Sequence, residues 1–379
     1  MKIKTTRQSL LNLLSRIAPV ADAKSTMPIL ANVLLRADAE RLNGCLSVAA
    51  SNLQIAMRAE LSVKVEDPGA ICVPARCTLD RIKAMPEGEI TIEANGTKVT
   101  IKAKGSARKF TLHGIPADEF PLLPEMKQVD SSHESTTAEL SEIIALTLFS
   151  VSEDVSRPHL NSLLLEVGKQ SLRAVSTDGH RLSMYMVGEP EASARPWLVP
   201  KAAAQRLKAL IDETSKDDDK PEMVRLAQSG HDLFATSGGF TLSVKLIDSQ
   251  FPPWQQVIPE KPHGDVTINR SVLLGAVKAL MVTTSDQTGG ITFSFAAGKL
   301  KLKAESADKG EGVDELDCEY DGKPAEYGMN GRYVIDLLSS MFSDSITLGI
   351  SGPLDPVRIE PAQKSAGRTH SAVIMPMRI

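Results

Sequence analysis

One pattern of helix signals occurs three times along the chain, and it constrains the possible folds more than any other feature. In the first copy, Leu10, Leu14 and Ile17 fall on one helical face behind a residue that can cap a helix. The equivalent starting points, about 130 residues apart, are Thr6, Ala138 and Asn269. A second helical pattern recurs with a similar period, after Pro74, Pro200 and Asn330. The sequence therefore predicts three copies of one structural unit.

Short runs in which apolar and polar residues alternate lie between the predicted helices. They include 90–93, 98–101, 241–244 and 300–303, and Gly and Asn separate them, which is typical of hairpin strands. Strands and two helices within one repeat form an α+β unit of ordinary domain size. We therefore predict an α+β protein with three repeated domains, each of two helices against antiparallel sheets. The expected domain boundaries are 1–128, 129–256 and 257–379.

The middle of the chain is predicted to form a hairpin with a polar tip. Apolar and polar residues alternate on both sides of Asp178-Gly179, and Gly accepts the positive φ of a tight turn. The tip then carries Asp178, His180 and Arg181. With Ser176 nearby, this set allows a hydrolase in which Asp178 and His180 activate a serine. We favour the simpler interpretation that Asp178 caps the turn, because a catalytic triad requires side chains that converge in space.

The composition excludes several classes of protein. The chain is 42% hydrophobic and 24% charged, which is ordinary for a soluble globular protein, and no apolar run is long enough to span a membrane. The first residues lack the apolar stretch of a secretory signal, so we expect a cytoplasmic protein. The four cysteines show no zinc-like spacing, and neither a phosphate loop nor a dinucleotide fingerprint is present. We therefore expect no metal, no cofactor and no catalytic residue.

Lysine and arginine are concentrated in the predicted helices. The six helical windows are 6–20, 75–85, 138–152, 201–211, 269–282 and 331–341. Together they carry a net charge of +7, which leaves −11 on the rest of a chain whose total is −4. Helix propensity does not explain this contrast, because helices favour Glu as strongly as Lys. A basic helical layer suits contact with phosphates without reading of bases.

Four short motifs resemble those of one protein family. They are the residues at 27–32, 73–76, 177–182 and 373–379. In this combination they are similar to the sliding clamp, the β subunit of bacterial DNA polymerase III, and the resemblance extends from the first residue to the last. It implies a head-to-tail homodimer that closes six domains into a ring around duplex DNA, with helices inside and sheets outside. It also implies a processivity factor that is a non-catalytic subunit of the polymerase holoenzyme.

The resemblance implies a pocket between the second and third domains that binds short peptides. Its expected partners are the catalytic subunit of the replicative polymerase, the clamp loader and repair proteins that carry clamp-binding peptides, with no membrane among them. The positions that match the family's pocket are Leu160, Thr177, Gly179, His180, Arg181, Leu182, Pro252, Val257, Asn330, Tyr333, Leu354, Pro356, Val373, Ile374, Met375, Pro376, Met377, Arg378 and Ile379. Apolar lining with a few polar groups suits peptide capture. Gln256 stands where the family often has Arg, so the exact peptide preference is left open.

The resemblance also assigns residues to DNA and to the contact between two chains. The positions that match basic DNA-binding positions are Lys24, Arg76 and Arg157. Pro158-His159 occupies a place where the family can have an aromatic pair. At the contact between chains, Phe110 and Leu112 are expected to form an exposed apolar pair. The positions expected to face this pair, or to add ion pairs near Arg76, are Met281, Val282, Asp314 and Glu315.

Two other functions remain open from the residues alone. One is a hydrolase that uses Asp178 and His180, which predicts that His180→Ala removes activity toward a small substrate. The other is a non-catalytic scaffold that does not bind DNA, against which the basic helices argue. Retention on nicked circular DNA, with release when the circle is linearised, separates both alternatives from a clamp.

Overall fold

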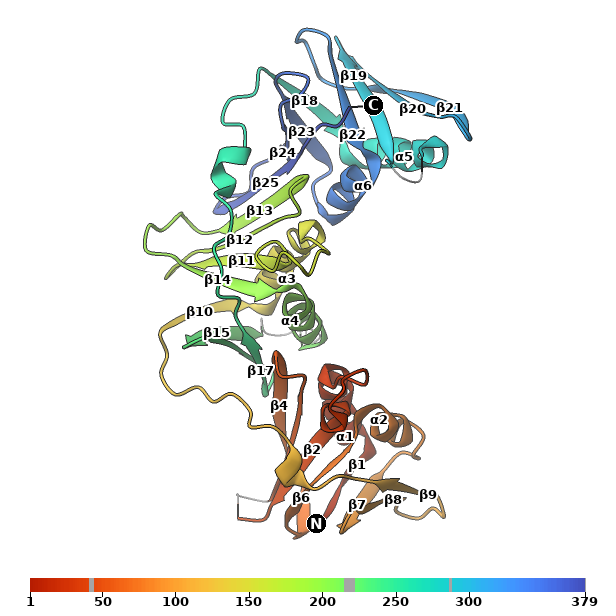
Figure 1. The fold of residues 1–379 in the computed structure, drawn as a ribbon, viewed down its shortest axis with the longest axis vertical. Coiled ribbons are helices and arrows are strands. Elements are labelled where there is room, and N and C mark those ends of the chain that lie inside the picture. Colours follow the sequence, from red (N-terminus) through yellow and green to blue (C-terminus); the bar gives the residue numbers. More distant parts are fainter. Residues whose placement is uncertain (41–43, 215–221, 286–287, 379) are drawn as a thin grey trace. The chain divides into compact units, whose positions relative to one another are not determined.

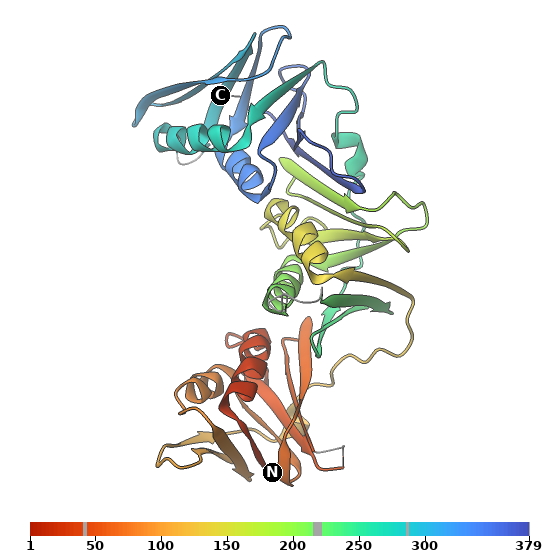
Figure 2. The same ribbon diagram turned by 180° about the vertical axis from the view of Figure 1, so that it is seen from behind.

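The computed structural model describes residues 1–40, 44–214, 222–285 and 288–378. The chain divides into two compact units, and Figures 1 and 2 show each of them from two sides. The first unit contains Met1–Ala138 and Ala209–Leu246, and the second contains Glu139–Lys208 and Ile247–Ile379. Helices and antiparallel strands recur in the predicted order, so the predicted α+β class is confirmed.

The α-helices of the described residues overlap the six predicted windows. They are α1 (Arg7–Ile17), α2 (Ala75–Lys83), α3 (Thr137–Ala145), α4 (Lys201–Thr214), α5 (Arg270–Leu280) and α6 (Gly331–Ser340). Helix α3 begins one residue before its window, and α4 extends three residues beyond its window. Thr6 caps α1 as expected, because its hydroxyl oxygen accepts a hydrogen bond from the N–H of Ser9 at 3.1 Å. The third window is too long. Helix α3 ends at Ala145, and the hydroxyl of Thr147 then donates to the carbonyl oxygen of Ile143 at 2.7 Å, which competes with helical hydrogen bonding.

The first unit is built on two antiparallel sheets. The five-stranded sheet has the order β5 (Lys64–Asp67), β1 (Lys2–Thr6), β7 (Glu89–Asn95), β8 (Lys98–Ala103) and β9 (Lys109–His113). The eight-stranded sheet has the order β10 (Ser131–Thr136), β15 (Met223–Ser229), β16 (Asp232–Ser237), β17 (Phe240–Lys245), β4 (Ile55–Ser62), β3 (Cys45–Ser51), β2 (Asn32–Asp38) and β6 (Gly69–Pro74). Helices α1 and α2 lie against each other and pack on strands of the longer sheet.

The second unit repeats this plan. Its eight-stranded sheet has the order β14 (Arg195–Pro200), β11 (Ser162–Val167), β12 (Leu172–Thr177), β13 (Arg181–Val187), β25 (Arg368–Ile374), β24 (Val357–Pro361), β23 (Ser345–Ile350) and β18 (Gly264–Asn269). Its four-stranded sheet has the order β21 (Gly310–Asp317), β20 (Lys299–Ser306), β19 (Gly290–Ala296) and β22 (Ala325–Asn330). Helices α5 and α6 pack against each other, as α1 and α2 do.

Strand pairing crosses the predicted repeat boundaries. In the first unit, β17 of the second repeat pairs antiparallel with β4 of the first. In the second unit, β13 of the second repeat pairs with β25 of the third, over seven residue pairs from Arg181↔Ile374 to Val187↔Arg368. Each long sheet is therefore shared by two repeats. This sharing explains why two compact units do not coincide with three repeats, and the predicted boundaries stay a prediction.

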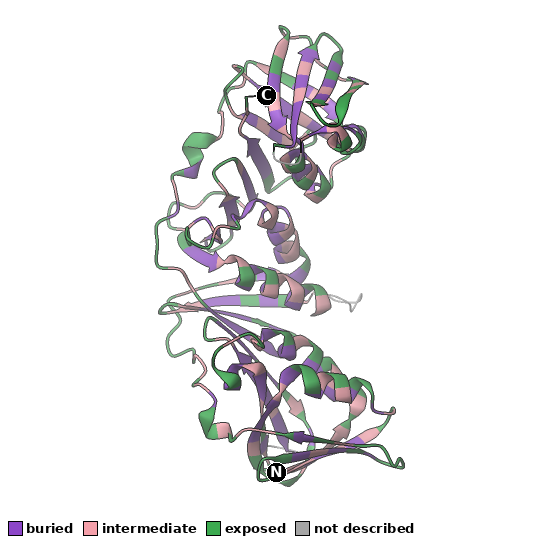
Figure 3. Cartoon of the chain, turned by 45° about the vertical axis from the view of Figure 1, so that its right-hand side comes forward, coloured by how far each residue is buried: buried purple, intermediate pink, exposed green. Residues whose placement is uncertain are grey.

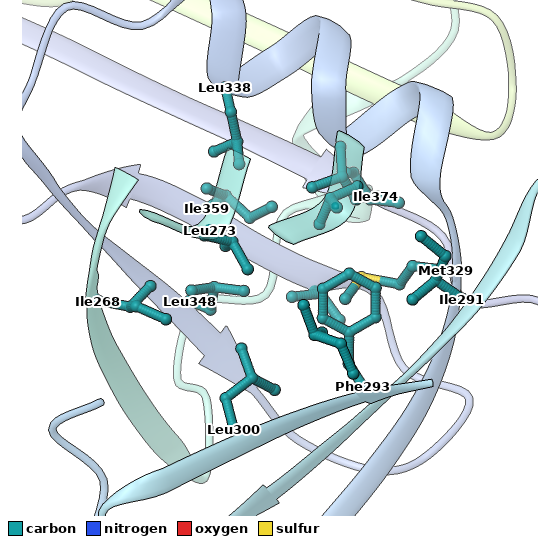
Figure 4. Packing of buried hydrophobic residues seen from close by; sticks show 14 of the residues in the cluster. Ile268, Leu273, Ile291, Phe293, Leu300, Met329, Leu338, Leu348, Ile359 and Ile374 are labelled. Atoms are coloured by element: carbon teal, nitrogen blue, oxygen red, sulfur yellow. The ribbon is translucent and has the colours of Figure 1, made fainter. Parts of the chain in front are cut away.

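Buried aliphatic side chains hold the helices to the sheets. Figure 4 shows Leu273 of α5 and Leu338 of α6 in one cluster with strand residues such as Phe293, and all three are almost completely buried. Figure 3 shows that strands and helices alike carry both buried and exposed residues. Because aromatic residues make up only 4% of the chain, Leu, Ile and Val fill most of this volume.

The prediction of an exposed apolar pair on β9 is wrong for Leu112 and holds only in part for Phe110. Leu112 is only 4% exposed, and Phe110 is half-buried. Both side chains lie on the same face of β9, where Leu112 pairs with Val99 and Phe110 with Ile101. Val99 and Ile101 are themselves buried, so the face of β9 that carries Leu112 is directed toward the core. The sequence alternation alone does not distinguish this face from an exposed one.

Candidate functional site

The hairpin tip is held by its own aspartate. Strands β12 and β13 pair up to Thr177↔Leu182, and the turn that joins them has Gly179 at a φ of +93°. The carboxylate oxygen Oδ1 of Asp178 accepts hydrogen bonds from the N–H groups of His180 at 2.9 Å and Arg181 at 3.1 Å. The interpretation that Asp178 caps the turn is confirmed.

The same geometry contradicts the hydrolase alternative. Ser176 is fully buried, and its hydroxyl donates to the carbonyl oxygen of Thr147 and contacts the hydroxyl of Ser150. The imidazole of His180 stacks on the ring of Tyr333, with the ring centroids 6.3 Å apart. Serine, histidine and aspartate therefore do not converge as a nucleophile and its base would have to.

The C-terminal tail lies against this tip. Beyond β25, the N–H of Met375 donates to the carbonyl oxygen of His180 at 2.8 Å, and the N–H of Met377 donates to the carbonyl oxygen of Gly328 at 2.8 Å. Met375, Pro376 and Met377 are half-buried, whereas Arg378 is exposed. The tail is therefore docked rather than frayed. The predicted pocket residue Ile379 lies outside the described residues.

A cavity of about 180 Å³ opens where the hairpin tip, the loop after β17 and the tail meet. Its lining is almost entirely apolar, and it brings together many of the predicted pocket positions. The lining residues are Leu160, Thr177, Gly179, Arg181, Leu182, Pro252, Trp254, Val257, Val373 and Met375. Trp254 is the member that the sequence analysis missed. It lies in the 3₁₀ turn Trp254–Val257 and is 6% exposed. The chain has only two tryptophans, and the place of this one close to the predicted pocket residue Pro252 was a signal that could have revealed it.

Arg181 is bonded inside the protein as well as lining the cavity. Its Nε donates to Oδ2 of Asp178 at 2.9 Å, and its Nη1 donates to Oδ2 of Asp336 at 2.6 Å. The guanidinium carbon lies 4.5 Å from the ring centre of Tyr333 and 5.6 Å from that of Phe149. These contacts connect the hairpin tip to α6 and fix the side chain in place. The guanidinium of Arg181, a predicted pocket residue, is therefore held by contacts within the chain.

Other predicted pocket residues have different surroundings. The side-chain oxygen of Asn330 accepts a hydrogen bond from the N–H of Arg332 at 2.9 Å, so Asn330 caps α6. Ile374 is buried in the core of the third repeat. Leu354 is 60% exposed, and neither Leu354 nor Pro356 lines the cavity, because both lie in the loop before β24 rather than at the tip.

The candidate DNA residues differ in their pairing. Lys24 and Arg76 are exposed, and neither forms an ion pair with a residue that the structure describes. Arg157 is also exposed, but its Nε lies 2.7 Å from Oδ2 of Asp154. Several helix cations are engaged as well: Arg7 with Glu87, Arg16 with Glu213, Lys201 with Glu153, and Arg270 with two carbonyl oxygens. The net charge of the predicted helices therefore overstates the charge that is free to meet a ligand.

Four candidate interface residues lie on two edge strands, and the other two, Met281 and Val282, lie in the 3₁₀ turn Met281–Thr283. Strand β9 ends the five-stranded sheet, and β21 ends the four-stranded sheet. Val282 is 72% exposed just after α5, and Met281 is half-buried. Asp314 and Glu315 lie on β21, where Glu315 is 3.3 Å from the ammonium of Lys299.

Among the helices of the described residues, none is both long and apolar enough to cross a membrane.

Comparisons with known proteins cover the whole chain. Family models of the DNA polymerase III beta subunit match in order: the N-terminal domain at residues 1–124, the central domain at 135–253 and the C-terminal domain at 255–378. The beta sliding clamp of Pseudomonas putida is 31% identical over 379 residues, covering 98% of each chain. The crystal structure of the DNA polymerase sliding clamp from Pseudomonas aeruginosa superimposes with a TM-score of 0.90 at 28% identity, covering 100% of both chains.

One further structure carries a ligand. It is the C. crescentus beta sliding clamp with polyethylene glycol at the region assigned there to β-motif tethering, with a TM-score of 0.90, 26% identity and full coverage of both chains. The three family models follow one another in the order of the three predicted repeats.

Proposed function

The chain belongs to the beta subunit family of bacterial DNA polymerase III, the beta sliding clamps, and from this premise we propose that two copies close head to tail into a ring around duplex DNA. As a member of this family it is a non-catalytic processivity factor of the polymerase. We also place it in the cytoplasm with the bacterial chromosome, because its relatives are bacterial replication proteins.

The cavity beside the tail is the proposed peptide site. We propose that it binds short motifs of the replicative polymerase's catalytic subunit, the clamp loader and repair proteins. The observation that carries this proposal is the apolar cavity that Leu182, Val373 and Met375 form between segments far apart in the sequence. Desolvated apolar pockets of this kind are where interface binding energy concentrates. The polyethylene glycol in the C. crescentus clamp supports a ligand site in the family.

Two sheet edges with opposite charge support the proposed dimer. Strand β9 carries Lys109 and follows Arg108, whereas β21 carries four acidic residues: Glu311, Asp314, Glu315 and Asp317. An edge strand has unpaired backbone groups, and pairing β9 of one copy with β21 of another would satisfy them. Because these two edges are different surfaces, the contact is heterologous, and it closes a ring when the rotation permits.

Weak and sequence-independent contact with DNA is proposed for Lys24 and Arg76. Both side chains are exposed cations without an ion pair among the described residues, so phosphates can approach them without displacing a carboxylate. Arg157 is a weaker candidate, because binding a phosphate would compete with Asp154. A ring that encloses DNA needs little affinity for phosphates, since the closed ring itself prevents the DNA from leaving.

Retention on circular DNA tests the proposed function. Protein loaded on a nicked circle by a clamp loader should stay with the circle in gel filtration and should be released when the circle is linearised. Retention that survives linearisation would indicate ordinary DNA binding, and no retention would favour the scaffold that does not bind DNA.

Charge reversal tests the proposed DNA residues in the same assay. Lys24→Glu with Arg76→Glu should lower loading or retention and make both less sensitive to salt. The matched control is Lys64→Glu with Lys98→Glu, two exposed strand lysines of the same unit. Equal effects of the two double variants would mean that only overall charge matters, and Lys24 and Arg76 would not be the contacts.

A further inference from the structure

A second and larger cavity lies at the opposite end of the strand pair that carries the peptide pocket. The pairing of β13 with β25 begins at Arg181↔Ile374, beside the peptide pocket, and ends at Val187↔Arg368. Near that far end, a cavity of about 390 Å³ is enclosed by α3, the segment after α6 and the loop between β24 and β25. This volume lies within the range of pockets that bind small molecules.

The wall of this cavity contains a buried histidine with a free acceptor. His370 is 7% exposed, and its Nε2 lies 3.2 Å from the hydroxyl oxygen of Ser183. The hydroxyl of Ser183 donates to the carbonyl oxygen of Leu146 at 2.6 Å, so in this bond His370 is the donor. Burial lowers the pKa of His370 to about 4, which keeps the ring neutral at pH 7. Its Nδ1 then carries a lone pair, for which the described residues supply no hydrogen-bond donor.

A carboxylate adds further acceptors to the wall. The Oε1 of Glu142 on α3 accepts from the hydroxyl of Tyr185 at 2.9 Å, and its Oε2 accepts from Nη1 of Arg368 at 2.6 Å. A carboxylate has about four lone-pair positions, so each oxygen keeps room for another donor. Arg368 neutralises this carboxylate, and Arg358 lies 3.6 Å from the other lining carboxylate, Glu360.

The mouth of the cavity has a different character. The loop at 361–368 has no acidic residue, and Lys364 has no ion pair among the described residues. Lys364, Ser365 and Thr369 supply a positive charge and hydrogen-bond donors at the rim. Among the other lining residues, Phe342 is 70% exposed and Met341 is buried. The cavity therefore combines inner acceptors, an aromatic wall and a cationic rim.

We propose that this cavity binds a nucleotide, with N–H groups of the base at His370 and Glu142, the base plane against Phe342, and the phosphate at Lys364. A flat aromatic group that carries both N–H donors and an attached anion satisfies all three features together. A purely apolar ligand would leave the inner acceptors desolvated without partners, and a simple anion would leave the aromatic wall unused. The nucleotide can be a free mononucleotide or the end of a single strand, and the binding measurements distinguish these sources.

The site is separate from the peptide pocket, and its test does not depend on the ring. Full-length protein is titrated by calorimetry with adenosine, guanosine and thymidine monophosphates, with the matching nucleosides, and with a 5′-phosphorylated single-stranded oligonucleotide. Saturable binding of mononucleotides identifies the free source, and binding of the oligonucleotide alone identifies the strand end. No saturable binding of any of them overturns the proposal.

Two surface variants and a control locate the binding. Lys364→Ala should weaken nucleotide binding about tenfold and leave nucleoside binding unchanged, because it removes only the phosphate contact. Phe342→Ala should weaken both, because it removes the stacking surface. Lys261→Ala, an exposed lysine of the same unit that does not line the cavity, should change neither. Binding that survives Phe342→Ala and Lys364→Ala unchanged would lie elsewhere and would overturn the proposal.

Discussion

The backbone N–H of Met375 donates to the carbonyl oxygen of His180 at 2.8 Å. This bond extends the pairing of β13 with β25 by one step beyond the end of the sheet. It brings the C-terminal tail to the polar tip of a hairpin from the middle of the chain. Because Met375 and Leu182 then line one cavity, the peptide pocket depends on the tail staying docked.

Deleting residues 375–379 should abolish binding of a polymerase-derived clamp-binding peptide. The deletion removes the Met375 wall of the cavity, whereas β25 ends at Ile374 and keeps its pairing with β13. Fluorescence anisotropy with the labelled peptide measures the loss, and sedimentation should show the same oligomer as the full chain. Gln256→Ala is the control, because Gln256 is exposed and does not line the cavity. Undiminished affinity in the deletion variant would place the groove elsewhere.

Arg181 should affect peptide binding mainly by holding the hairpin tip to α6, and changing its partner Asp336 tests this role. Asp336 does not line the cavity, but its carboxylate holds Nη1 of Arg181 at 2.6 Å. Asp336→Asn should therefore weaken peptide binding by a few-fold, and Arg181→Ala should weaken it by about tenfold or more. The same anisotropy assay measures both variants. A role as a direct peptide contact alone predicts that Asp336→Asn has no effect, and that result would exclude the positioning role.

Local signals in the sequence predicted much of the fold. Thr6 and Asn330 precede apolar helical patterns and do cap α1 and α6, because a cap depends only on residues within one turn. The Asp178-Gly179 turn was equally local. The shared sheets were not predictable in this way, since the pairing of β17 with β4 joins strands from different repeats.

The candidate site was only partly predictable for the same reason. Leu112 alternates with polar neighbours like a surface residue, but its partner across the strand pair is the buried Val99. The sequence places Arg181 in the pocket, but it does not show that the carboxylate of Asp336, far away in the sequence, holds its guanidinium. Trp254 was missed because burial beside the hairpin depends on how the loop after β17 folds back. Burial and side-chain pairing depend on distant residues, which a local pattern does not contain.

His370 should make folding stability depend on pH between about 6.5 and 4. Burial lowers the pKa of its imidazole from 6.5 to about 4, so within this range the unfolded chain binds a proton that the folded chain does not. The neutral imidazole contributes fully to the free energy of unfolding above pH 6.5. This contribution, about 3 kcal/mol in total, is lost as the pH falls toward 4. The groups that face the imidazole of His370 are Ser183 and Tyr185. The hydroxyl of Tyr185 donates to Glu142, which also accepts a hydrogen bond from Arg368.

Urea unfolding at several pH values measures this contribution. His370→Gln should be less stable at pH 7.5 but should lose less stability on acidification than the unmodified protein. His263→Gln, which changes an exposed histidine of the same unit, is the control and should keep the original pH dependence. Parallel loss of stability in all three proteins would show that His370 does not titrate as expected.

Phe110→Ala should weaken the dimer, whereas Leu112→Ala should mainly destabilise the fold. Phe110 is half-buried on an edge strand, so its remaining surface is available to a second copy. Truncating an aromatic anchor at the centre of an interface commonly costs 2 kcal/mol or more, which is roughly a 30-fold rise in the dissociation constant. Leu112 is buried already, and removing its side chain leaves a cavity that costs about 2–5 kcal/mol of folding stability.

Sedimentation and thermal unfolding separate these two effects. Phe110→Ala should shift the monomer–dimer equilibrium with little change in the unfolding of the isolated monomer, and Leu112→Ala should lower the unfolding temperature. Reversing charge at either edge, with Lys109→Glu or Asp314→Lys, should weaken the dimer, and combining both should restore part of it because the new charges are again opposite. If Phe110→Ala leaves the dimer unchanged and the combined reversal restores nothing, β9 and β21 do not meet, and the head-to-tail arrangement must use other surfaces.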